Sequence, residues 1–164
     1  MSSLLCPLHP ETKPRQAAPG LRLCAWHVDG ITGDLDAIAA AWGDLCAAVD
    51  PQHTRGESGT RVSGTPDSTI PIDVHAVDVE RDVQRRVARL ASDLYLDTDY
   101  RPYRDEYDVP GLARWVGRHA DWVARRDDAA LVAEGLREVL RAVRSVAYPS
   151  GVRVFDVAPC PVAD

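Results

Sequence analysis

Cys6-Pro-Leu-His9 and Cys24-Ala-Trp-His27 are the two short stretches that decide how this chain folds. Both have the form Cys-x-x-His. A two-residue gap lets one tight turn present two ligands to the same metal ion, and a structural zinc ion takes four thiolate or imidazole ligands in a tetrahedron. The spacing therefore predicts one zinc site made of Cys6, His9, Cys24 and His27.

The Pro19-Gly20 pair between the two stretches would bring the second ligand pair back to the first. Proline sets φ at the first central position of a type II turn, and glycine accepts a positive φ at the second. Two alternatives stay open, namely a Cys6–Cys24 disulfide and four residues with no common role. Residues 1–20 lack the apolar segment of a secretory signal, so we expect a reducing cytoplasmic location, which favours zinc over a disulfide.

Length and composition limit the class of protein. A chain of 164 residues suffices for one domain with a core, or for a small metal module attached to one. A hydrophobic content of 45% excludes wholesale disorder. No apolar run approaches the ~18 residues that a membrane span needs. The net charge of −6 argues against a large phosphate-binding surface.

Apolar residues at helical spacing predict four helices after the metal module. The expected helices cover about 34–49, 74–95, 109–126 and the stretch between Asp128 and Pro149. We expect Gly30 and Gly33 to interrupt the chain before the first helix, because each glycine costs a helix about 1 kcal/mol relative to alanine. The expected N-caps are Asp34, Asp73, Asp108 and the Asp127-Asp128 pair.

The predicted fold class is therefore mainly α, with a small N-terminal zinc knuckle of treble-clef-like form followed by a four-helix body. The predicted domain organisation is a zinc-binding module over 1–30, a helix joining it to the body over 31–49, a linker or long loop over 50–72, a helical domain over 73–148 and a C-terminal tail over 149–164.

Two further groups of residues are candidates for binding. A polar segment holds Tyr100, Tyr103 and Tyr107, and tyrosine-rich segments suit protein contacts because a rigid ring offers area and a hydroxyl together. The metal module holds candidate nucleic-acid contacts: Lys13, Arg15 and Arg22 for phosphate and Trp26 for base stacking.

No catalytic residues are predicted. The chain has no nucleophile elbow and no glycine-rich phosphate loop. Cys46 lies beside an apolar stripe with no basic neighbour at helical spacing, so we interpret it as an inert buried thiol. His119 lies on the apolar face of a predicted helix, where a hydrogen-bonded structural role is expected.

The order of features resembles a group of uncharacterised zinc-ribbon proteins of actinobacteria and their phages. The resemblance rests on the paired ligands, Gly20-Leu21-Arg22-Leu23-Cys24, Ser63-Gly64-Thr65 ahead of Pro71, Trp115-x3-His119-x2-Trp122, an arginine-rich last helix and Pro159-Cys160-Pro161. The site of those relatives typically has four cysteines, so His9 and His27 here remove two negative charges. Longer relatives continue into a second cysteine cluster and often a helix-turn-helix. Because this sequence ends at Asp164, we expect Cys160 to lack those partners.

These observations predict a non-enzymatic zinc-binding protein that acts in regulation through an unidentified protein partner. The resemblance implies a phage or actinobacterial origin. The alternative is a nucleic-acid-associated zinc protein with a role related to transcription. One structural zinc ion is the expected cofactor, and no membrane contact is expected.

Overall fold

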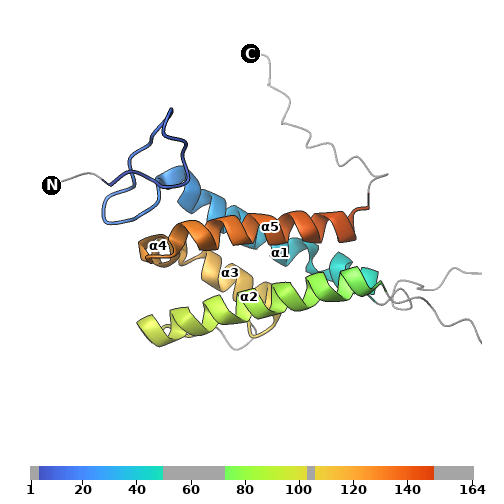
Figure 1. Ribbon diagram of the computed structural model, residues 1–164. Helices are drawn as coiled ribbons and strands as arrows, with labels where there is room; N and C mark the ends of the chain where they lie inside the picture. Colours follow the sequence, from blue (N-terminus) through green and yellow to red (C-terminus); the bar gives the residue numbers. More distant parts are fainter. Residues whose placement is uncertain (1–3, 50–72, 103–105, 150–164) are drawn as a thin grey trace, which may run out of the picture.

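The computed structural model describes residues 4–49, 73–102 and 106–149. Within these ranges the chain is mainly helical (Figure 1), with helices α1 (Ala25–Val49), α2 (Val74–Thr98), α3 (Val109–Gly117), α4 (Ala120–Arg125) and α5 (Ala129–Ala147). The predicted mainly α fold with an N-terminal cysteine and histidine module is confirmed. The predictions for the linker 50–72, for Tyr103 and for the tail from residue 150 lie outside the described residues.

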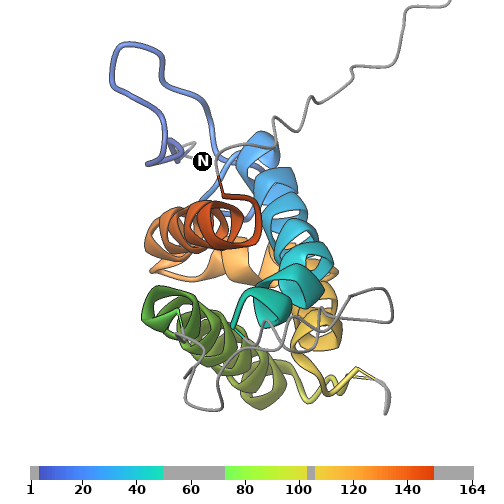
Figure 2. The ribbon, with the colours of Figure 1, turned by 90° about the vertical axis from the view of Figure 1, so that its right-hand side faces the viewer.

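The helices enclose one apolar core. α1 packs against α3 and α5, and α2 packs against the same two helices, as the end view in Figure 2 shows. All five helices contribute to the largest fully buried side chains, which include Ile31, Leu35, Ile38, Leu45, Val83, Val87, Leu94, Val116, Val123 and Val143. Burial of each such side chain stabilises the fold by about 1.5–3 kcal/mol. The N-terminal segment lies at one end of this bundle (Figure 1).

Two of the predicted helix caps are confirmed. The Asp73 carboxylate accepts hydrogen bonds from the backbone N–H groups of His75 and Ala76 at 3.0 and 3.2 Å. Asp108 accepts one from Gly111 at 2.8 Å, with a proline in the first turn of α3, where its missing N–H costs nothing. α2 runs past its predicted end at residue 95 to Thr98.

The predicted start of the first helix at Asp34 is wrong, since α1 begins at Ala25 and passes through Gly30 and Gly33 without a break. Two glycines cost a helix about 2 kcal/mol together. Ile31 lies between them and is 1% exposed, and its burial alone offsets a cost of that size. Asp34 is therefore not a cap, and its carboxylate lies 3.9 Å from the Arg137 guanidinium of α5.

The predicted continuous helix over 109–126 is also wrong, because it divides into α3 and α4 at Arg118 and His119. The Nδ1–H group of His119 donates to the Trp115 carbonyl at 2.9 Å. The His119 backbone N–H bonds instead to the Val116 carbonyl at 2.9 Å, three residues back. The imidazole thus takes the acceptor that a continuing α-helix would give to the backbone. The hydrogen bond expected for His119 is therefore present.

Asp128 stands at the predicted N-cap position of the last helix but does not cap it with its side chain. Its carboxylate accepts two hydrogen bonds from the Arg126 guanidinium, at 2.8 and 3.0 Å. Arg126 also donates to Asp93 of α2 at 3.1 Å. This network joins α2 to the α4–α5 connection.

None of the described helices is long and apolar enough to cross a membrane.

Trp115 provides a test of the core. Its side chain is 3% exposed, so Trp115→Ala is expected to lower the free energy of unfolding by ~3–5 kcal/mol, measured by urea denaturation. Trp26→Ala is the matched control, because the Trp26 side chain is 61% exposed and its loss should cost less than ~1 kcal/mol. Equal losses in the two variants would contradict the placement of Trp115 in the core.

Candidate metal centre

The segment before α1 folds back on itself at the predicted turn. The backbone N–H of Leu21 donates to the Ala18 carbonyl at 2.9 Å, which closes a four-residue turn around Pro19-Gly20. Gly20 has φ +75°, the left-handed value that the second central residue of a type II turn requires. The turn prediction is confirmed.

The first ligand pair lies on a short hairpin. Leu5 and Gln16 form a single antiparallel bridge, and the Cys6 backbone N–H donates to the Arg15 carbonyl at 2.8 Å. The His9 N–H donates to the Cys6 carbonyl at 3.3 Å. That bond makes the tight turn that a two-residue gap permits, so Cys6 and His9 face the same point.

The second ligand pair lies at the start of α1. Cys24 directly precedes the helix, and its carbonyl accepts hydrogen bonds from the backbone N–H groups of His27 at 2.9 Å and Val28 at 3.1 Å. Residues three apart lie on one face of a helix. The first turn of α1 therefore aims Cys24 and His27 in one direction.

The two pairs meet, and the four predicted ligands form a group that can hold a metal ion. Their four ligand atoms all lie within 4.8 Å of one another. The His27 Nδ1 atom is 3.3 Å from the sulfur of Cys6 and 3.3 Å from that of Cys24, and His9 Nε2 is 3.3 Å from Cys24 Sγ. Cys6 and Cys24 are free thiols, so the disulfide alternative is wrong for this structure.

Burial decides the protonation of His27. This histidine is 2% exposed, and burial, followed by the electrostatic influence of Arg137 and weaker effects of neighbouring groups, lowers its pKa to about 4. The imidazole is thus neutral at pH 7, which is the form that binds metals. Cys6 and Cys24 are also buried, whereas His9 lies partly at the surface.

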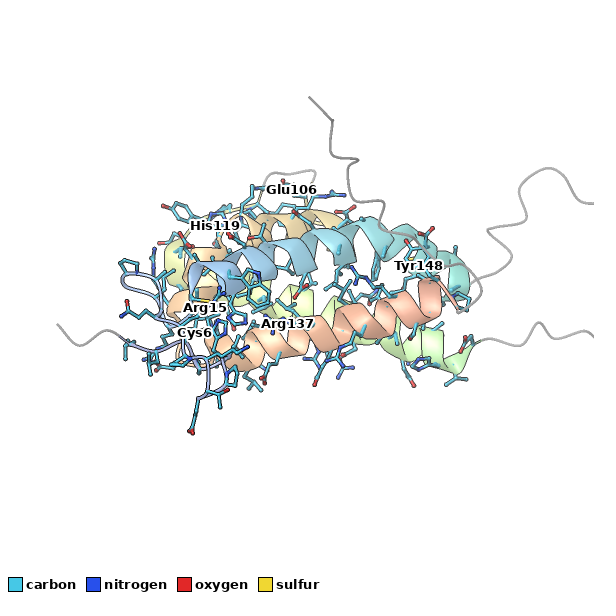
Figure 3. All side chains as sticks on the ribbon, turned by 90° about the horizontal axis from the view of Figure 1, so that it is seen from above. Cys6, Arg15, Glu106, His119, Arg137 and Tyr148 are labelled. Atoms are coloured by element: carbon cyan, nitrogen blue, oxygen red, sulfur yellow. The ribbon has the colours of Figure 1, made fainter. Side chains whose placement is uncertain are left out.

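Trp26 and Arg137 surround the ligand group. The Trp26 ring meets the His27 ring edge to face, with centroids 4.7 Å apart. The Arg137 guanidinium carbon lies 6.0 Å from the Trp26 ring centroid, within the reach of a cation–π contact. Figure 3 shows Cys6 and Arg15 at one end of the bundle, Arg137 farther along α5, and Tyr148 toward the other end.

The N-terminal segment is attached to the bundle beside the ligand group. Leu23 is fully buried, and the Arg22 backbone N–H donates to the Ala124 carbonyl of α4 at 2.8 Å. The Arg22 guanidinium pairs with the Asp127 carboxylate. The metal ligands therefore stand on a hairpin that is bonded to α4 and on a helix that belongs to the core.

The other candidate residues do not form one site. Lys13 and Arg15 are exposed on the N-terminal segment. Tyr100 and Tyr107 are exposed by 60% and 63%. Cys46 is half-buried and not fully buried as predicted, and partial burial raises the pKa of its thiol.

Arg137 is a residue of this site that sequence reasoning missed. It follows the predicted ligands by more than a hundred positions in the chain. Only the packing of α5 against α1 brings it to Trp26 and Asp34. No local pattern in the sequence identifies it.

No known protein family, curated protein or solved structure matches the chain.

Cys24 gives the most direct mutational test of this site. Cys24→Ser, in protein purified without a histidine tag, is expected to abolish metal binding and to collapse the amide NMR signals of residues 4–23, while the helices stay folded. Cys46→Ser is the matched control and should keep its metal, because Cys46 lies outside the ligand group. Elemental analysis that finds as much metal in Cys24→Ser as in the wild type would refute the assignment.

Proposed function

We propose that this protein is a non-enzymatic zinc protein whose metal-fixed N-terminal module presents a surface to a protein partner, in a regulatory role. The observation that carries the proposal is the convergence of two thiols and two imidazoles from two separate segments. A bound ion would link the hairpin to α1, and an interaction surface built on both would depend on that link.

Zinc is the ion that this ligand set fits best. Zinc–sulfur bonds of about 2.3 Å and zinc–nitrogen bonds of about 2.0–2.1 Å, at a tetrahedral angle, place sulfur and nitrogen about 3.6 Å apart. The three sulfur–nitrogen distances of 3.3 Å are close to that value. Two thiolates and two imidazoles in a tetrahedron are typical of zinc, whereas calcium and magnesium prefer oxygen ligands.

A structural role follows from the number of ligands. Catalytic zinc keeps one position open for water or substrate. Four protein side chains would fill the tetrahedron here, and three of them are buried. In small zinc modules the metal supplies ~10–16 kcal/mol of apparent folding free energy, so zinc would stabilise a segment too small to hold a core of its own.

The surface of the module supports a role in protein contacts. Trp26 is 61% exposed, and Leu4 and Leu5 are each 60% exposed. Trp26 directly follows the start of α1, and Leu5 lies in the hairpin bridge. Tryptophan is enriched among the residues that dominate binding energy at protein interfaces. We infer that these three side chains form the contact surface, here termed the module surface.

A nucleic-acid partner has weaker support. Of the candidate phosphate contacts, Arg22 already pairs with Asp127, and the nearby Arg137 lies beside Asp34. Lys13 and Arg15 remain, which is few for a phosphate-binding surface. Trp26 is exposed enough to stack on a base. The capture experiment therefore has to distinguish a nucleic-acid partner from a protein partner.

The test is quantitative affinity capture with the purified wild type from an extract of the source cells, with and without nuclease. We expect a captured protein that survives nuclease treatment and whose affinity falls by about thirtyfold in Trp26→Ser, the loss of an interface hot spot of ~2 kcal/mol. Leu5→Ser should weaken capture as well.

Leu96→Ser is the matched control, since Leu96 is 74% exposed on α2, outside the module surface. It should leave capture unchanged. Capture that disappears with nuclease would favour the nucleic-acid role, and equal effects of Leu5→Ser and Leu96→Ser would contradict the module surface.

A further inference from the structure

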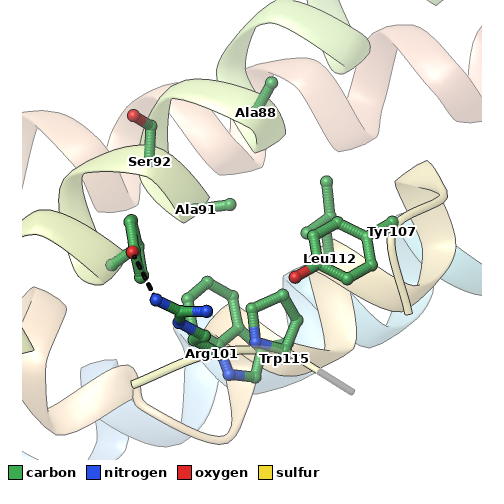
Figure 4. A pocket seen from close by; sticks show the side chains of 9 residues that line it. Ala88, Ala91, Ser92, Arg101, Tyr107, Leu112 and Trp115 are labelled. Atoms are coloured by element: carbon green, nitrogen blue, oxygen red, sulfur yellow. Dashed lines mark hydrogen bonds between the residues drawn. The ribbon is translucent and has the colours of Figure 1, made fainter. Parts of the chain in front are cut away.

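A pocket lies between α2, the Arg101-Pro102 segment and the start of α3 (Figure 4). Its volume is ≈ 420 Å³, within the range of about 300–1,000 Å³ typical of small-molecule sites. It contains none of the metal ligands. Ligand binding in this pocket would therefore be separate from the protein contacts proposed for the module surface.

Small side chains on α2 leave this space open. Ala88, Ala91 and Ser92 line one wall of the pocket, at positions that share one face of the helix. Ala88 and Ser92 are exposed, whereas Ala91 belongs to the core. A leucine at position 88 would reach into the space that the alanine methyl group leaves.

The facing walls are aromatic. Tyr107 and Trp115 line the side of the pocket opposite α2 (Figure 4), and Tyr95 of α2 closes one end of the α2 wall. Trp115 is 3% exposed and held by the core, whereas Tyr107 is 63% exposed. Figure 4 shows Tyr107 and Trp115 across the pocket from the small side chains of α2. Planar apolar ligands fit such a space, because aromatic pairs gain ~0.5–1.5 kcal/mol beyond the burial of their area.

One positive charge stands at the edge of this apolar space. The Arg101 guanidinium donates to the Tyr95 hydroxyl at 3.2 Å and lies 5.5 Å from the Tyr95 ring centroid. Among the described residues no carboxylate forms an ion pair with it. Arg101 can therefore donate to an anionic ligand.

We propose that this pocket binds a small aromatic carboxylate. Its ring lies between the α2 alanines and the aromatic wall, and its carboxylate accepts hydrogen bonds from Arg101. A planar guanidinium matches a carboxylate in a two-point contact. A single arginine, as the one charged residue that lines a mostly apolar pocket within the described part of the chain, favours one negative charge over the multiple charges of a phosphate ester.

The test compares 2-naphthoate with its neutral analogue 2-naphthamide, using calorimetry and the NMR shifts of the Ala88, Ala91 and Leu112 methyl groups. The wild type should bind 2-naphthoate at least tenfold more tightly than 2-naphthamide, since a hydrogen bond to a charged group is worth roughly that factor. Equal affinities, or shifts at methyl groups elsewhere, would overturn the proposal.

Two variants test separately the contribution of the Arg101 charge and the contribution of the open pocket volume to binding. Arg101→Gln should weaken 2-naphthoate about tenfold and leave 2-naphthamide unchanged. Ala88→Leu should weaken both compounds at least tenfold by filling the pocket. Since Ala88 is exposed on a helix and leucine is a good helix former, the variant should fold, and circular dichroism checks this.

Each variant has a control of the same chemistry. Arg85→Gln removes an exposed arginine of α2 that lies outside the pocket, and Ala40→Leu enlarges an exposed alanine of α1. Both controls should bind the two compounds as the wild type does. Unchanged 2-naphthoate affinity in Arg101→Gln, or undiminished binding in Ala88→Leu, would refute the site.

Discussion

The convergence of Cys6, His9, Cys24 and His27 is the constraint on which the N-terminal half of this structure depends. Two of these residues belong to a hairpin with a single bridge, and the other two are Cys24, directly before a long core helix, and His27 in its first turn. A hairpin of this size buries too little apolar surface to be stable alone. A metal ion held by all four ligands would make the hairpin and the helix one unit.

This unit is joined to the bundle by ordinary packing and hydrogen bonds. Leu23 enters the core, Arg22 bonds to α4 and pairs with Asp127, and Arg137 of α5 reaches Trp26. Contacts from α4 and α5 therefore hold the segment that carries the ligands. The outer face of the module still exposes Trp26, so the arrangement combines a fixed scaffold with an uncovered aromatic side chain.

The features that the sequence predicted well are those fixed by local chemistry. Each of these features depends on a few consecutive residues. They are the paired spacing of the ligands, the Pro19-Gly20 turn and the caps Asp73 and Asp108. The continuation of α1 through Gly30 and Gly33 could not be predicted in the same way, because burial of Ile31 against other helices outweighs the cost of two neighbouring glycines. The break after α3 depends on which donor reaches the Trp115 carbonyl. The sequence pattern of an amphipathic helix does not contain that information.

X-ray absorption at the zinc edge, on protein purified without a histidine tag, is the measurement that tests the central claim most directly. We expect one zinc ion per chain, with two sulfur atoms at about 2.3 Å and two nitrogen atoms at about 2.0–2.1 Å. Protein that contains no zinc, or a zinc shell made mainly of oxygen atoms, would contradict this expectation. In that case the four side chains would be held together by hydrogen bonds and packing alone.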